Sequence, residues 1–211
     1  HYSRIAIPNN PVTDDASFLV LVENINKATL DAVDILKTCE MNYLVMGMSA
    51  ATFWNGRAGA QSYLDMMTER AGVGVSCGSF ATEAALNILK VKRIAFLSPY
   101  FKVANDQVRR FYQDCGFTVV RDVCFERPSP VQIAHSTDAM CRDAIKQLDG
   151  DDVDAIVQVG TNLSMIRLAA AAELFLGKPV IAINTATYWH ALRSCGITDR
   201  RAGFGSLLEH H

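Results

Sequence analysis

The sequence predicts an α/β protein with two similar lobes of parallel sheet, and with a ligand site in the cleft between the lobes. Apolar strands alternate with helices along most of the 211 residues, which is typical of parallel sheets covered by helices on both faces. One strand–turn–helix pattern occurs twice, in residues 43–89 and in residues 153–197. We infer from this repeat that two half-domains present their turns to each other.

The first half of the chain opens with a helix. Apolar residues recur at helical spacing over residues 17–39, behind Asp14, Asp15 and Ser17, whose side chains are common at helix N-termini. Strands and helices then alternate at residues 43–47, 58–71, 73–77 and 82–89. The strand that starts at Arg93 ends where Ser98 and Tyr100 enter a loop.

In the second half, Gly116 is expected just beyond a helix over residues 104–115, a position where glycine is common. Pro130 lies where the next helix is expected to start, over residues 131–148. Strands are expected at residues 117–125, 153–160 and 179–183. The polar residues expected to open the helices after the last two strands are Thr161, Asn162 and Ser164, and then Asn184, Thr185 and Thr187.

Polar groups also follow the two earlier strands of the repeat. Gly47 and Ser49 follow the strand of residues 43–47, and Ser76, Cys77 and Ser79 follow the strand of residues 73–77. Hydroxyls and free backbone N–H groups at helix N-termini bind small anions. Because ligands of parallel sheets bind beyond the carboxyl ends of the strands, the sequence predicts a small-anion site at these turns.

Composition excludes several classes of partner and cofactor. A formal net charge of -2 and a pI near 6.2 give no reason to expect nucleic acid. No apolar run is long enough to cross a bilayer, and the opening residues lack the signal-peptide pattern, so no membrane partner is expected. Gly72-Val-Gly is too short for a dinucleotide fingerprint, so we expect no nucleotide cofactor.

The six cysteines show no metal-ligand spacing. In a chain of this size they are expected to be reduced thiols of a cytoplasmic protein, without a metal site. Residues 208–211 look like the start of an expression tag. The sequence leaves a homo-oligomer open.

Five motifs, in this order, resemble the arylmalonate decarboxylase and maleate cis-trans isomerase family of the Asp/Glu racemase superfamily. They are Leu44-Val-Met-Gly-Met-Ser, Phe80-Ala-Thr-Glu-Ala-Ala-Leu, Arg93-Ile-Ala-Phe-Leu-Ser-Pro-Tyr, Gly160-Thr-Asn-Leu and Gly177-Lys-Pro-Val-Ile-Ala-Ile-Asn-Thr-Ala-Thr-Tyr-Trp-His-Ala-Leu-Arg. The resemblance covers nearly the whole chain. It implies two pseudo-symmetric Rossmann-like lobes and a cofactor-free site in the cleft between them.

The resemblance also implies lobe boundaries. The first lobe is expected over residues 1–90 and 188–207, and the second over residues 91–187. About one N-terminal strand and its substrate-binding loop are expected to be missing before His1.

The family's catalytic cysteines correspond to two glycines here. Racemases and isomerases of the family use one cysteine at a strand end in each lobe, and the decarboxylases keep only the second. The resemblance places these positions at Gly47 and Gly160. Gly47 matches the decarboxylase pattern, whereas Gly160 removes the thiol that reprotonates the decarboxylase product.

The substrate-binding positions of the family are better preserved. Ser49 and Tyr100 match side chains that donate hydrogen bonds to a substrate carboxylate, and the backbone of Thr161 and Asn162 matches the donors of the second lobe. Met48 replaces a hydroxyl residue. For the proton donor, the sequence offers Cys77, because a cysteine at a helix N-terminus has a lowered pKa. The alternative for Cys77 is a small buried residue at a strand end.

Three functions follow as hypotheses. The first is a cofactor-independent decarboxylase that acts on a malonate-type acid through an enediolate. The second is a cis-trans isomerase or racemase of a small dicarboxylate or amino acid. The third is a degenerate protein that binds a small carboxylate without turning it over.

Overall fold

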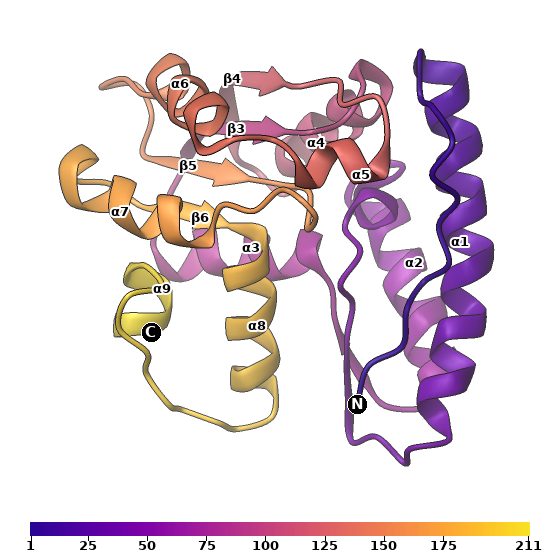
Figure 1. Cartoon of the computed structure of the whole chain (residues 1–211). Coiled ribbons are helices and arrows are strands. Elements are labelled where there is room, and N and C mark those ends of the chain that lie inside the picture. Colours follow the sequence, from indigo (N-terminus) through magenta and orange to yellow (C-terminus); the bar gives the residue numbers. More distant parts are fainter.

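The computed structural model describes residues 1–211, which form two parallel sheets with helices packed around them (Figure 1). The larger sheet has the order β4-β3-β5-β6, with β3 at Arg93–Ser98, β4 at Thr118–Cys124, β5 at Ala155–Gln158 and β6 at Val180–Ala182. The smaller sheet pairs β1, Tyr43–Val45, with β2, Gly74–Ser76. Every strand pair is parallel, which confirms the predicted α/β class.

Ten helices surround the sheets. They are α1 Asp15–Lys37, the 3-10 helix η1 Ala50–Phe53, α2 Gly56–Ala71, α3 Gly78–Ile88, α4 Lys102–Asp114, α5 Pro130–Ala134, α6 Asp138–Leu148, α7 Ile166–Leu176, α8 Ile183–Ser194 and α9 Ser206–His210. No helix combines the length and apolar character that crossing a lipid bilayer requires.

The larger sheet is buried on both faces, as its continuous apolar strands predict. Alternate residues of a strand point to opposite faces. In β3, Ile94 and Phe96 pack with α3 and α4, whereas Ala95 and Leu97 pack with α6 and α7, and all four are fully buried. The smaller sheet has a core of its own beneath α1 and α2. The two sheets are therefore unequal, with four strands in one and two in the other.

Capping sets the start of α1 as the sequence predicts. The Asp14 carboxylate accepts a hydrogen bond of 2.8 Å from the Ser17 backbone N–H, and the Ser17 hydroxyl accepts one from the Asp14 N–H. This reciprocal pair satisfies two donors that the first turn of a helix leaves free. The helix begins two residues before the predicted start, because Asp14 rather than a later residue is the N-cap.

The single helix predicted over residues 131–148 is wrong. The chain forms α5 and α6 instead, and α5 ends at Ala134 with His135 as its C-cap. The Thr137 hydroxyl accepts a hydrogen bond of 3.3 Å from the Met140 N–H and so caps α6. A capping threonine inside a helical pattern is a signal for a new N-terminus, and it outweighed the periodicity.

The helix opening predicted at Thr161, Asn162 and Ser164 is also wrong, because α7 starts only at Ile166. The polar groups of Thr161 and Asn162 are used elsewhere. The Thr161 hydroxyl donates to the Gly47 carbonyl at 2.9 Å, and the Asn162 amide donates to the Pro130 carbonyl at 2.7 Å. These residues therefore join distant segments instead of capping a helix.

The two chain ends pack against the rest of the protein. The N-terminal residues run alongside α1, where the Val12 N–H donates to the Pro128 carbonyl at 2.7 Å (Figure 1). Leu208, in the segment expected to be a tag remnant, is buried in the core with Leu207. The lobe boundary expected between residues 187 and 188 falls inside the continuous helix α8, which contacts α3 and both strands of the smaller sheet.

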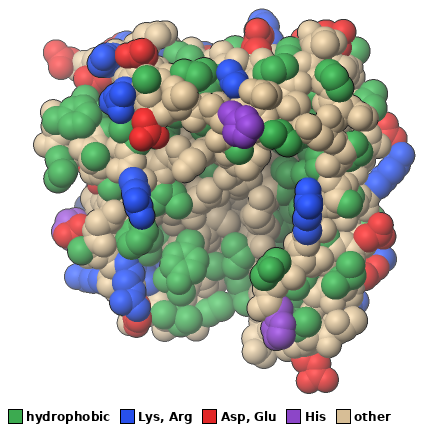
Figure 2. All heavy atoms as spheres, viewed as in Figure 1, with side chains coloured by type: hydrophobic (Ala, Val, Ile, Leu, Met, Phe, Trp, Pro, Cys, Tyr) green, Lys and Arg blue, Asp and Glu red, His purple; other side chains and the backbone are tan.

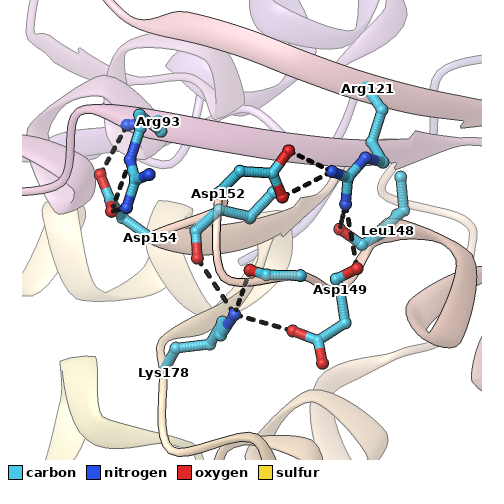
Figure 3. A network of polar contacts seen from close by, with 9 residues as sticks. Arg93, Arg121, Leu148, Asp149, Asp152, Asp154 and Lys178 are labelled. Carbon is cyan, nitrogen blue, oxygen red and sulfur yellow. Dashed lines mark hydrogen bonds and ion pairs between the residues drawn. The ribbon is translucent and has the colours of Figure 1, made fainter.

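Ion pairs hold the loop that leads into β5 (Figure 3). The Lys178 ammonium lies 2.8 Å from the Asp149 carboxylate and donates to the Gly150 and Val153 carbonyls. Arg121 pairs with Asp152, and Arg93 pairs with Asp154 at 2.6 Å. Hydrogen bonds from the Arg93 side chain and backbone lower the pKa of Asp154 to about 2.

We expect the Asp154 pair to make stability depend on pH. Because the folded-state pKa lies below the unfolded value of about 3.9, the pair stabilises the fold above that value and loses this effect as the pH falls towards 2. Asp154→Asn should therefore be less stable than the natural chain near pH 6, with the difference in unfolding free energy shrinking in acid. Urea unfolding at several pH values measures this. Asp143→Asn, which breaks an exposed pair with Lys146, should change little and is the control.

Candidate functional site

A cavity of about 510 Å³ lies where the turns of the two lobes meet. It contains every site residue proposed from the sequence except Cys77. Its wall is formed by the end of β1, the end of β3, the turn after β5, α1, α5 and the N-terminal residues, with the lining Ser3, Arg4, Ile5, Ile7, Asn9, Phe18, Leu21, Ile25, Gly47, Met48, Ser49, Ala50, Pro99, Tyr100, Pro130, Val131, Ile133, Ala134, Gly160, Thr161 and Asn162. Figure 2 shows that the surface is hollowed between the part formed by α8 and the part formed by α1 and the N-terminal residues.

Two buried hydroxyls form the polar end of this cavity. The Ser49 and Tyr100 oxygens lie 2.9 Å apart, and the Thr161 N–H donates to the Ser49 oxygen at 3.1 Å. One hydroxyl of the pair donates to the other, so one O–H remains free to donate to a ligand. Burial raises the pKa of Tyr100, which keeps its phenol protonated and able to donate. The pair is therefore suited to a carboxylate.

Backbone donors add to the hydroxyls. The N–H groups of Met48, Ser49 and Asn162 donate to no group of the protein. Backbone N–H groups that are left free at the edge of a cavity are donors for an anion. The remaining wall is mostly apolar, and Arg4 is the only charged residue in the lining. Arg4 forms no ion pair within the protein.

Gly47 and Gly160 differ in backbone conformation and in the space around them. Gly160 has φ +92°, and a Cβ atom there would lie 2.5 Å from the ring of Pro99. Glycine is therefore the residue that this turn requires. Gly47 has no positive φ, and a Cβ atom there would meet nothing within 4 Å. Only the first position has room for a side chain.

Cys77 lies outside the cavity. It is the N-cap of α3, with only 2% of its surface exposed, and it belongs to the core of the smaller sheet. The expected lowering of its pKa is wrong, because burial raises the pKa of this thiol. Cys77 therefore does not meet a ligand bound in this cavity. No cysteine lines the cavity.

The N-terminal residues, α1 and α5 are the parts of the wall that sequence reasoning missed. Ile5, Ile7 and Val131 carry no local signal for a site, because isolated apolar residues near a proline occur in many loops. Only their packing across the strand ends brings them to the cavity. No group of three or more histidine, cysteine or acidic residues is arranged to hold a metal ion.

The family model for arylmalonate decarboxylase matches residues 15–208 of this chain. Maleate isomerase from Pseudomonas putida is 28% identical over 125 residues, which are 59% of this chain and 50% of that protein. Maleate isomerase from Geobacillus stearothermophilus is 27% identical over 125 residues, 58% of this chain and 49% of that protein. In sequence, the match thus spans about half the length of these relatives.

Solved structures show the same fold. A mutant of Nocardia farcinica maleate cis-trans isomerase with a covalently bound succinylcysteine intermediate superposes with a TM-score of 0.88 at 19% identity, over 97% of this chain and 84% of that one. A mutant of arylmalonate decarboxylase in the liganded form superposes with a TM-score of 0.83 at 20% identity, over 97% of this chain and 86% of that one.

Proposed function

Because the chain belongs to the arylmalonate decarboxylase family, whose model matches residues 15–208, we propose that it decarboxylates a small malonate-type acid without a cofactor. The observation that carries this proposal is the meeting of Ser49, Tyr100 and Thr161 in one cavity, beside backbone N–H groups that have no partner in the protein. These donors converge from three separate parts of the chain on one place where a carboxylate fits.

The reaction uses these donors to hold negative charge. One carboxylate of the substrate accepts hydrogen bonds from the free hydroxyl of the Ser49–Tyr100 pair and from the N–H groups of Met48 and Asn162. The bond between Cα and the other carboxylate breaks, CO₂ leaves, and the electron pair spreads onto the retained carboxylate as an enediolate. Each donor aimed at that developing charge contributes about 2.7–4 kcal/mol to lowering the barrier.

The apolar part of the cavity destabilises the carboxylate that leaves as CO₂. Ile7, Phe18 and Leu21 line it and offer no hydrogen bonds to a charged group. A carboxylate that loses its hydration there is less stable than the neutral CO₂ that it becomes. The same wall accommodates an apolar substituent on Cα, as the substrate class of a substituted malonate requires.

The last step adds a proton to Cα. No thiol lines the cavity, so we propose that water supplies this proton. A freely moving donor reaches both faces of a planar enediolate. We therefore expect a racemic product from a malonate that carries two different substituents on Cα, as measured by chiral chromatography. A single enantiomer would contradict the assignment to water and point to a fixed donor.

The decisive experiment is a panel of malonates with alkyl and aryl substituents. Release of CO₂ together with uptake of one proton supports the proposed reaction. Binding without CO₂ release, seen by calorimetry, would replace it with a carboxylate-binding role. Neither binding nor turnover across the panel would overturn the proposal.

An isomerase is the second candidate, because the matched relatives from Pseudomonas putida and Geobacillus stearothermophilus are maleate isomerases. Thiol addition to an alkene needs a cysteine at the substrate, and none lines this cavity. This ranks the isomerase behind the decarboxylase. Conversion of maleate to fumarate, followed by NMR, would reverse the order.

A further inference from the structure

We propose that Gln158 and Asn184 are positioning residues that set the directions of two backbone N–H donors, Thr161 towards the Ser49 oxygen and Asn162 towards the bound carboxylate. This inference rests on the proposed function of the same cavity. Both side-chain amides donate hydrogen bonds to carbonyl oxygens of the turn that follows β5. Neither residue lines the cavity, so neither contacts the ligand.

The argument starts from the geometry of the peptide unit. In a trans peptide, the C=O of one residue and the N–H of the next lie in the same rigid plane and point in opposite directions. All peptide bonds of the chain are trans. A side chain that holds a carbonyl oxygen in place therefore also sets the direction of the following N–H.

Gln158 holds the Gly160–Thr161 peptide unit together with the Leu163 N–H, which also donates to the Gly160 carbonyl, at 3.0 Å. The Gln158 amide nitrogen donates to the Gly160 carbonyl at 2.8 Å and to the Val159 carbonyl at 2.6 Å. In the same peptide unit, the N–H that points away from the Gly160 carbonyl belongs to Thr161. It donates to the Ser49 oxygen at 3.1 Å. The hydrogen bond from Gln158 to the Gly160 carbonyl thus directs the Thr161 N–H towards the Ser49–Tyr100 hydroxyl pair.

Asn184 holds the second peptide unit. Its amide nitrogen donates to the Thr161 carbonyl at 2.8 Å. Asn184 is in the first turn of α8, where no side chain caps the helix, so this amide is committed to the turn instead. The N–H opposite the Thr161 carbonyl belongs to Asn162 and has no partner in the protein. Asn184 therefore directs a donor that is free for a ligand.

A carbonyl held by a side chain, with a free N–H opposite it, also occurs at Gly47. The Thr161 hydroxyl donates to the Gly47 carbonyl at 2.9 Å, and the opposite N–H of that peptide unit belongs to Met48. This N–H also has no partner in the protein. The peptide units of the Gly160, Thr161 and Gly47 carbonyls are thus held in place, and the N–H groups that follow them are left for the Ser49 oxygen and a ligand.

The burial of Gln158 argues against a purely structural role. Only 1% of its surface is exposed, and its side-chain oxygen has no hydrogen-bond partner. A buried acceptor without a partner destabilises the fold, and an apolar side chain of similar length would remove that cost. The two hydrogen bonds to the turn are what the glutamine adds.

Gln158→Met tests this directly, because methionine fills the same space without an amide. We expect an unchanged or raised melting temperature, together with about tenfold weaker binding of phenylmalonate, the size of one lost hydrogen bond, because Thr161 no longer holds the Ser49 hydroxyl in place for the ligand. In a ¹⁵N–¹H NMR spectrum, the amide signals of Thr161 and Asn162 should shift or broaden. Asn184→Asp, which replaces the donor with an acceptor, should affect the Asn162 amide more than the Thr161 amide.

Two control variants make the same changes elsewhere. Gln147→Met and Asn87→Asp alter exposed residues and should leave the amide signals and the binding unchanged. The NMR signals report positioning even if no carboxylate binds, so a failure of the proposed function is seen separately. A lowered melting temperature with unchanged Thr161 and Asn162 signals in Gln158→Met would overturn the inference and leave Gln158 a structural residue.

Discussion

Tyr100→Phe is expected to lower the rate of decarboxylation by about 10²–10³-fold, the usual cost of removing one donor from an oxyanion site. The phenol is buried and lies 2.9 Å from the Ser49 oxygen, so its loss leaves the pair with a single hydroxyl proton. That remaining proton has no second hydroxyl to hold its direction. The fall should appear mainly in kcat, because the charge on the retained carboxylate grows in the transition state.

The chain contains a matched control for this variant. Tyr112 is also fully buried, and its hydroxyl lies 2.9 Å from the Thr82 hydroxyl, away from the cavity. Tyr112→Phe and Tyr100→Phe should each reduce the free energy of unfolding by about 1 kcal/mol, but Tyr112→Phe should leave the rate unchanged. Equal rate losses in both variants would show that the effect comes from the fold and not from the donor.

Gly47→Cys is expected to raise the rate of decarboxylation and to make the product predominantly one enantiomer. Gly47 lines the cavity, has no positive φ, and leaves open space where a side chain would start. A thiol at this position stands on one side of the enediolate and protonates one face. General acid catalysis contributes about 10²–10⁴-fold where proton transfer limits the rate. Initial rates and chiral chromatography of the product measure both effects.

The same substitution at the second glycine should fail for a physical reason. Gly160→Cys puts a Cβ atom 2.5 Å from Pro99, in a backbone conformation with φ +92°. Strain of this kind costs about 1–3 kcal/mol, and it displaces the turn that carries the Thr161 donor. We expect a lower melting temperature and no gain in rate. A Gly160→Cys variant that is stable and more active than Gly47→Cys would contradict the assignment of the two positions.

Much of the fold could be predicted from local patterns. Continuous apolar runs marked strands buried on both faces, and the Asp14 and Ser17 pair marked the start of α1 within two residues. The exceptions have a common cause. Thr137 falls inside a helix predicted from periodicity, and Thr161 was expected to open a helix. Thr137 instead caps a new helix, and the Thr161 hydroxyl donates to the Gly47 carbonyl. A threonine hydroxyl can cap a helix or bond to a distant carbonyl, and its neighbours in space decide between the two.

The sequence by itself determined the class of the protein and the polar residues of one cavity. Parallel strands place their carboxyl ends together, so Ser49, Tyr100 and Thr161 could be brought to one cavity from strand order and family motifs alone. Only the tertiary structure decided that Gly47 has room for a side chain while Gly160 does not, and that Cys77 is buried away from the cavity. The reason is that space at a residue is set by side chains far away in the chain, such as Pro99 against Gly160, and no local pattern records that distance.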